Sequence, residues 1–124
     1  MHKILIIDDE LPVRFSLRMI LKGFPNLEID EAHNGREGLE KIQQKKYDLA
    51  FLDIKMPDMQ GDEVVEALQA YPDKPKIVLV SAYTHTPVGK KIAPHVQGVI
   101  AKPFSVEEIR SVLKNLLIET NARG

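Results

Sequence analysis

Five short apolar segments, separated by stretches with helical periodicity, limit the folds open to this chain more than any other feature. Antiparallel hairpins need only a few connecting residues, whereas parallel strands need a long crossover, usually a helix. The segments begin about 21 to 28 residues apart, at Lys3–Ile7, Leu27–Ala32, Asp48–Leu52, Lys76–Val80 and Gly98–Ala101. This spacing predicts a strand–helix unit repeated five times and a parallel sheet.

The composition of each segment predicts its place in the sheet. The first, third and fourth segments contain uninterrupted apolar runs, which are typical of strands covered by helices on both faces. The second alternates apolar and acidic residues and the fifth is short, and both features suit edge strands. We therefore predict an α/β fold with a doubly wound five-stranded parallel sheet of order 2-1-3-4-5.

The helical segments differ in the strength of their signals. Pro12 suits the first turn of a helix that ends near Gly23, and its apolar face is expected to include Phe15, Met19 and Ile20. The last helix has an apolar stripe that begins at Val106 and is expected to pack on the sheet.

Two capping signals and one weak helix complete the pattern. Asn34 and Ser105 are each followed three residues later by Glu, which predicts two capping boxes. The segment Thr84–Val96 contains Pro87, Gly89 and Pro94, so we expect a short, broken or mobile helix there.

Composition excludes several classes of function. The 124 residues are 44% hydrophobic and 28% charged, with a net charge of −1, which argues against direct nucleic-acid binding. The chain has no cysteine, which excludes disulfides, thiolate catalysis and cysteine-ligated metals. No apolar run approaches the ~18 residues of a membrane helix. We expect a cytoplasmic protein without membrane contact, with one domain over 1–119 and a C-terminal tail over 120–124.

Carboxylates follow two strands that are predicted to be neighbours. Asp8 and Asp9 end the first strand and Asp53 ends the third, on either side of the point where strand order reverses. Carboxylates this close repel one another unless a cation neutralises them. Oxygen ligands without Cys or His nearby favour Mg²⁺.

Two further strand ends complete a plausible phosphoryl-transfer site. Ser81 supplies a hydroxyl after the fourth strand and Lys102 supplies an ammonium after the fifth. With the metal, these groups would allow Asp53 to form an aspartyl-phosphate. Each residue alone has an ordinary explanation, such as a helix cap for Asp9 or a solvated charge for Lys102. The prediction rests on their convergence at one end of the sheet.

These residues also carry a resemblance that extends over essentially the whole chain. The sequence resembles the receiver domains of two-component response regulators, and it is most similar to the stand-alone phosphorelay intermediates. The resemblance lies in the segments Ile4–Glu10, Asp53–Gly61, Ser81–Tyr83 and Ala101–Phe104. It implies a flavodoxin-like three-layer sandwich and a phosphoprotein of a two-component system or phosphorelay.

The resemblance also implies a role for each site residue. Asp53 would accept a phosphoryl group from the phosphohistidine of a sensor histidine kinase or histidine phosphotransfer protein. Asp9 and Asp53 would bind Mg²⁺ directly, Asp8 would bind it through water, and the backbone carbonyl of Lys55 would complete the protein ligands. A downstream effector protein would recognise the phosphorylated form.

The catalytic side chains and their loops follow in the same way. Ser81 would hydrogen-bond the phosphoryl oxygens as the switch hydroxyl, and Lys102 would pair with another phosphoryl oxygen. The Lys102–Pro103 peptide would be cis, and Gly61 would suit a backbone position with positive φ. Tyr83 occupies a position that influences the lifetime of the phosphoryl group in this family.

One position departs from the family pattern. Val99 stands where many receivers carry a Tyr or Phe that swings inward on activation, and valine has no ring to rotate. We hypothesise that signalling uses rearrangement of Thr84–Val96, or simple docking, in place of an aromatic flip.

Two other classes of function stay open from the sequence. The first is a Mg²⁺-dependent phosphohydrolase with Asp53 as its nucleophile, although no further acid/base residue or substrate cap is evident. The second is a degenerate receiver that acts only as an interaction module. We expect a receiver that catalyses only its own phosphorylation and dephosphorylation and is not otherwise an enzyme.

Overall fold

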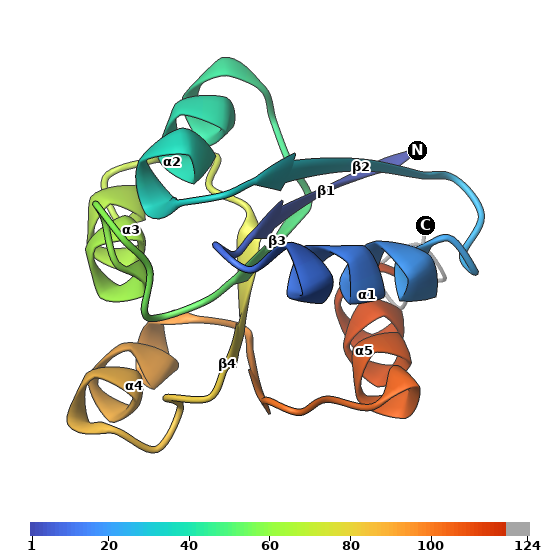
Figure 1. Ribbon diagram of the computed structural model, residues 1–124. Helices are drawn as coiled ribbons and strands as arrows, with labels where there is room; N and C mark the ends of the chain where they lie inside the picture. Colours follow the sequence, from blue (N-terminus) through green and yellow to red (C-terminus); the bar gives the residue numbers. More distant parts are fainter. Residues whose placement is uncertain (119–124) are drawn as a thin grey trace.

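A parallel sheet with helices on both faces forms the centre of the protein (Figure 1). The computed structural model describes residues 1–118. Its strands are paired in the order β2-β1-β3-β4-β5, which confirms the predicted fold. The elements are β1 His2–Ile7, α1 Leu11–Leu21, β2 Leu27–Ala32, α2 Gly35–Gln44, β3 Leu49–Leu52, α3 Gly61–Leu68, β4 Lys76–Ser81, α4 Pro87–Ile92, a 3₁₀ turn Ala93–His95, β5 Gly98–Ala101, α5 Val106–Leu113 and a π-helical turn Lys114–Ile118.

The register of the strands brings the ends of β1 and β3 together. Ile7, the last residue of β1, pairs with Leu52, the last residue of β3. The residues that follow each strand, Asp8 and Asp53, therefore leave the sheet side by side. On the other side of β3, β4 continues to Ser81, which pairs with Ala101 of β5.

Alternation along the strands divides the core into two layers. In β1, Leu5 and Ile7 belong to the layer beneath α2, α3 and α4, whereas Ile4 and Ile6 belong to the layer beneath α1 and α5. All four residues are buried, as expected for a central strand covered on both faces. The same arrangement of helices is visible in Figure 1.

The predicted inner face of α1 is confirmed at Ile20, which packs against the core beside Leu17 and Leu21, but it is wrong at Phe15 and Met19. Phe15 and Met19 are 61% and 53% exposed, whereas Leu17 and Leu21 are buried. The helix carries two apolar stripes, and the pair spaced four residues apart at Leu17 and Leu21 packs on the sheet. The second stripe lies beside the turn before α5, in a shallow groove that Phe104 also lines.

The weak helix is short and broken, as predicted. Thr86 caps the six-residue α4, and its Oγ1 accepts a hydrogen bond from the backbone N–H of Gly89. Pro87 occupies the first turn, where a missing N–H costs little, and Pro94 lies in the 3₁₀ turn that follows.

The two predicted capping boxes differ in outcome. The Ser105 and Glu108 side chains cap each other's backbone N–H, as predicted. Asn34 Oδ1 accepts from the N–H of Glu37, but the Glu37 carboxylate accepts from the N–H of His33 instead of closing the box at Asn34. The backbone before α2 turns so that the N–H of His33, and not that of Asn34, points toward the Glu37 carboxylate.

Two further predictions concern the ends of the chain and the membrane. The predicted domain boundary at residue 119 and the tail 120–124 lie outside the described residues. Within residues 1–118, no helix is long and apolar enough to cross a membrane.

Candidate phosphoacceptor site

Four carboxylates meet where β1 and β3 end. Oxygen atoms of Asp8, Asp9, Glu10 and Asp53 all lie within 4.8 Å of one another. Asp8 and Asp53 are only 2% and 5% exposed, whereas Asp9 and Glu10 are open to solvent. The structure thus brings together the three predicted aspartates and adds Glu10, which the sequence analysis did not single out.

The Lys102 ammonium lies among these carboxylates. Its Nζ donates to Asp8 Oδ2 at 2.9 Å, to Glu10 Oε1 at 3.2 Å and to Asp53 Oδ2 at 3.3 Å. Burial lowers the pKa of Lys102, but the neighbouring Asp8 and Asp53 raise it by more, and the net shift is upward. Lys102 is therefore positively charged at neutral pH.

Burial has the opposite consequence for Asp8. Loss of solvent raises the pKa of the Asp8 carboxyl, and the charge of Asp53 adds to the rise. The Glu10 N–H, which donates to Asp8 Oδ1 at 2.9 Å, and the Lys102 ammonium lower the pKa in part. The net shift of the Asp8 pKa is upward. The Glu10 N–H and the Lys102 ammonium therefore do not fully offset burial and the charge of Asp53, and an additional positive charge would stabilise the ionised site.

The donor set of this site fits Mg²⁺. Four carboxylates face one ammonium, and carboxylate oxygens are the hard ligands that Mg²⁺ prefers. Asp53 is already oriented, because its Oδ1 accepts from the N–H of Ile54 at 2.8 Å. A divalent cation would supply the charge that Lys102 alone cannot.

A hollow of about 390 Å³ opens above Asp53. It is lined by Asp9, Glu10, Asp53, Lys55, Ala82, Tyr83 and Lys102. The Lys55 ammonium lies 5.2 Å from the centroid of the Tyr83 ring, so these two side chains meet at its edge. A small phosphorylated group that approaches Asp53 from this side would therefore meet the charged side chains of Lys55 and Lys102.

Ser81 lies at the end of β4 and is fully buried. Its Oγ accepts a hydrogen bond from the backbone N–H of Tyr83 at 3.1 Å. The hydroxyl is thus tied to its own loop, while its hydrogen stays available for donation. Of the predicted side chains, Asp9, Asp53, Lys55 and Lys102 line the hollow, whereas Asp8 and Ser81 do not.

Two backbone predictions have different outcomes. The Lys102–Pro103 peptide is cis, as predicted. Gly61 does not have positive φ, so that prediction is wrong. A Cβ at Gly61 would lie 2.3 Å from the carbonyl oxygen of Asp53, so the glycine is required by close approach of the backbone.

Sequence reasoning missed two residues, Glu10 and Arg14, that belong to or contact the loop Asp8–Glu10 after β1, here called the acidic loop. Glu10 follows Asp8 and Asp9 directly, and its acidic side chain was a signal that could have been used. Arg14 donates from its guanidinium to the backbone carbonyl of Asp8 at 2.7 Å. No local pattern marks Arg14, because its carboxylate partner Glu31 lies 17 residues away in the sequence.

Comparison with known proteins agrees with this geometry. The family model described as the response regulator receiver domain matches residues 4–114. The chain belongs to the response regulator receiver domain family. Receiver domains are phosphoacceptor signalling domains of two-component systems, and this family implies a phosphodonor such as a histidine kinase.

Individual relatives show how receiver domains are used in other proteins. The chain is 36% identical over 115 residues to the transcriptional regulatory protein ResD of Bacillus subtilis, covering 93% of this chain and 48% of ResD. It is 41% identical over 83 residues to a protein-glutamate methylesterase/protein-glutamine glutaminase of Desulfotalea psychrophila, covering 66% of this chain and 23% of that protein. The chain therefore spans half or less of the length of these relatives.

A solved structure supports the fold. The response regulator protein TrrA of Thermotoga maritima, in complex with Mg²⁺ and BeF, matches with a TM-score of 0.83 and 35% identity. The match covers 94% of this chain and 100% of that one.

Proposed function

We propose that Asp53 is the phosphoacceptor of this receiver and that its phosphorylation depends on Mg²⁺. The observation that carries the proposal is the position of the Asp53 carboxylate, which is buried, adjoins the hollow and lies 3.3 Å from the Lys102 ammonium. A carboxylate oxygen is a nucleophile toward phosphorus, and the Lys102 ammonium beside Asp53 can offset the negative charge of the group being transferred.

The reaction follows from this arrangement. A carboxylate oxygen of Asp53 attacks the phosphorus of a phosphohistidine, an O–P bond forms, and the N–P bond to the imidazole breaks. Lys102 remains protonated and offsets the negative charge on a transferring oxygen. The Ser81 hydroxyl turns toward another phosphoryl oxygen and donates a hydrogen bond to it. Attack of water later returns Asp53 and inorganic phosphate.

The metal ligands in the proposal are those that the family resemblance implies. Asp9 and Asp53 bind Mg²⁺ directly, Asp8 binds it through water, and the Lys55 backbone carbonyl completes the set. When bound, the ion adds positive charge next to the transferring oxygens and helps to align them. The location of four carboxylate oxygens within 4.8 Å supports this part of the proposal.

Two kinds of partner protein follow from this function. The phosphodonor is a sensor histidine kinase or a histidine phosphotransfer protein, and a downstream effector recognises the phosphorylated state, as in stand-alone phosphorelay intermediates. The chain catalyses only its own phosphorylation and dephosphorylation. We propose no direct contact with nucleic acid or membrane, because a chain with a net charge of −1 has no overall positive field to attract them.

The proposal is tested by intact-mass measurement after incubation with Mg²⁺ and acetyl phosphate. We expect one phosphoryl group on the wild type and none on Asp53→Asn. Asp58→Asn, a change at an exposed aspartate of the same loop, is the matched control and should be modified like the wild type. Reactions with a phosphorylated histidine kinase domain would then test the protein donor.

Other outcomes would favour the alternative functions. Modification of Asp53→Asn would contradict the assignment of the acceptor. Steady turnover of small phosphate esters would favour a phosphohydrolase, and absence of both Mg²⁺ binding and modification would favour an interaction module.

A further inference from the structure

Arg14 connects α1 to the acidic loop and to β2 at once. Its guanidinium donates from one terminal nitrogen to the carbonyl oxygen of Asp8 at 2.7 Å. Its Nε donates to Glu31 Oε1 at 3.0 Å. The side chain is largely buried, so water competes little with these bonds. Because the guanidinium is planar, the two bonds fix its orientation together.

The bond to Asp8 fixes the peptide that joins Asp8 to Asp9. The N–H of Asp8 donates to the carbonyl of Ala32 at 3.1 Å, which extends the β1–β2 ladder by one residue. The Asp8 carbonyl, at the other end of the residue, is held by Arg14. The residue that enters the acidic site is therefore held by backbone bonds on both sides.

Asp9 depends on this support more than its neighbours do. Asp8 and Asp53 have side-chain hydrogen bonds, but the Asp9 side chain has no hydrogen bond or ion pair with any residue of the described range 1–118. Its carboxylate is also exposed. The direction in which Asp9 leaves the backbone is thus set mainly by the peptide that Arg14 holds.

We propose that Arg14 is a positioning residue for the metal site: it holds the Asp8–Asp9 peptide in the orientation that lets both carboxylates face a bound Mg²⁺. This inference rests on the proposed function of the site. Groups that orient metal ligands commonly change metal affinity by 10- to 100-fold when they are removed.

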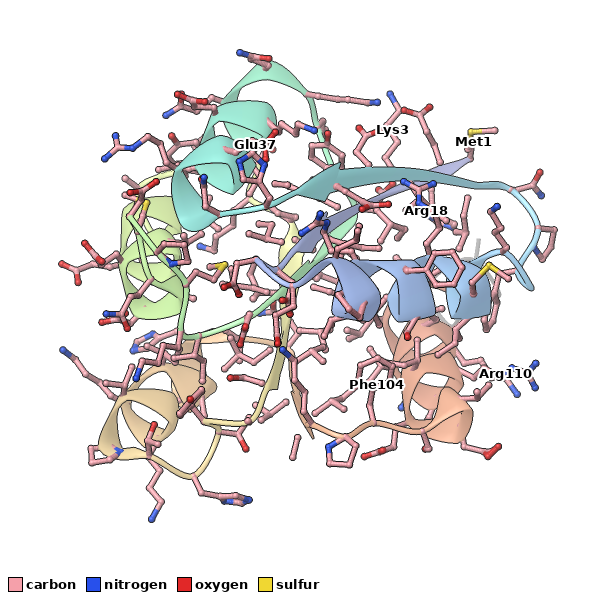
Figure 2. The ribbon with its side chains drawn as sticks, viewed as in Figure 1. Met1, Lys3, Arg18, Glu37, Phe104 and Arg110 are labelled. Atoms are coloured by element: carbon pink, nitrogen blue, oxygen red, sulfur yellow. The ribbon has the colours of Figure 1, made fainter. Side chains whose placement is uncertain are left out.

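A simpler explanation is that Arg14 only fastens α1 to β2. Arg18, one turn later, makes the same kinds of bond, since its Nε donates to Glu31 Oε2 at 2.5 Å and its terminal nitrogen donates to the Ile29 carbonyl at 3.2 Å. Arg18 lies alongside β2, on the same helix (Figure 2). Its carbonyl partner belongs to the middle of β2, away from the acidic loop. Arg18 is therefore a matched control for the fastening role.

The experiment compares Arg14→Gln, Arg14→Lys and Arg18→Gln with the wild type in Mg²⁺ titrations by isothermal calorimetry. We expect Arg14→Gln to raise the Mg²⁺ dissociation constant by about 10-fold and Arg14→Lys to lie between it and the wild type. Arg18→Gln should stay within about twofold of the wild type, although it loses comparable hydrogen bonds and should destabilise the fold similarly.

A kinetic measurement separates positioning from catalysis. Arg14→Gln should raise the Mg²⁺ concentration that gives half-maximal phosphorylation by acetyl phosphate by about the same 10-fold factor, with the rate at saturating Mg²⁺ within twofold of the wild type. Equal Mg²⁺ affinities in all variants, or equal losses in Arg14→Gln and Arg18→Gln, would overturn the inference.

Two controls keep the outcome clear. If Arg14→Gln does not fold, Arg14→Lys tests the same contact, and it should weaken Mg²⁺ binding more than Arg18→Gln does. If the wild type itself binds no Mg²⁺, the proposed function fails. If the wild type binds and Arg14 variants bind equally well, only the positioning role fails.

Discussion

Asp8 is the residue at which the fold and the site make opposing demands. Its carboxylate is buried beside Asp53, and the single ammonium of Lys102 is shared with Asp53 and Glu10. Burial therefore leaves the pKa of Asp8 above its ordinary value of 3.8, despite the hydrogen bonds it accepts. The buried negative charge of Asp8 destabilises the metal-free protein. The same charge favours Mg²⁺ binding, because the positive ion removes part of that destabilisation.

This conflict gives a prediction for Asp8→Asn in metal-free buffer. Because the folded state holds the Asp8 proton more tightly than the unfolded state does, the stability from protonated Asp8 is complete below pH 3.8 and is lost as the pH rises through the raised pKa. At pH 7 the variant should be more stable than the wild type by on the order of 1 kcal/mol. The difference should shrink as the pH falls toward 4. Urea unfolding at several pH values measures it.

Asp9→Asn is the matched control for this prediction. Asp9 is adjacent in sequence but exposed, so neutralising it should change the free energy of unfolding by less than about 0.5 kcal/mol. A loss of stability in Asp8→Asn at pH 7 would show that its bonds to Lys102 and the Glu10 N–H outweigh the cost of burial.

At the scale of elements, the loop after β3 depends on close approach of α3. Gly61 begins α3, and its N–H donates to the Ile54 carbonyl at 2.6 Å. A Cβ there would meet the Asp53 carbonyl, a backbone atom that cannot move without displacing the acceptor. We expect Gly61→Ala to destabilise the protein by roughly 2 to 3 kcal/mol and to slow phosphorylation.

Gly23→Ala provides the comparison. An added Cβ there would lie 3.3 Å from the Ile20 carbonyl, at the exposed end of α1, so its effect should stay within about 1 kcal/mol. Thermal unfolding of the two variants measures the change in stability, and their phosphorylation rates measure the effect on the Asp53 loop. Equal behaviour of the two alanine variants would mean that the loop adapts without cost.

A second prediction at this scale concerns the segment Thr84–Val96. The Ser81 Oγ accepts from the Tyr83 N–H, and the Tyr83 carbonyl accepts from the Thr86 N–H and Oγ1. A Ser81 hydroxyl that turns toward a phosphoryl group would disturb this chain of bonds. With beryllofluoride and Mg²⁺, we expect amide hydrogen exchange in this segment to change by at least several-fold. Unchanged protection would count against rearrangement and would favour simple docking.

Val99 is the reason why the response is expected in Thr84–Val96 and not in β5. It is exposed on β5 and has no ring to carry a signal across the sheet. A Val99→Ala variant should therefore leave the exchange response of Thr84–Val96 unchanged, which distinguishes the loop from β5 as the responding element.

The same elements show what can be predicted from the sequence. Strand order follows from the composition of the five apolar segments, and the meeting of Asp8, Asp9 and Asp53 follows because parallel strands place their carboxyl ends at one edge. The inner face of α1 does not follow, since the apolar stripes through Phe15 and Leu17 are equally plausible until neighbouring helices are placed. The contact between Arg14 and Asp8 depends on side-chain geometry across elements, which periodicity does not encode.

At the scale of the whole molecule, the overall charge and the charge of the site differ. The net charge is −1, so no global field attracts cations, whereas four carboxylates gather around one ammonium at the end of β1 and β3. Any stabilisation by Mg²⁺ should therefore come from this site alone. It should follow mass action, because a ligand that binds only the folded state shifts unfolding by its own binding free energy.

The last prediction uses that linkage. At a Mg²⁺ concentration 100 times the dissociation constant, the free energy of unfolding should rise by about 2.7 kcal/mol and the melting temperature by on the order of 10 °C. The rise should vanish in the double variant Asp9→Asn, Asp53→Asn, which keeps the fold but loses two proposed ligands. NaCl at equal ionic strength controls for screening of carboxylate repulsion. An equal rise in NaCl, or an equal rise in the double variant, would show that Mg²⁺ acts on the surface in general and not at the carboxyl ends of β1 and β3.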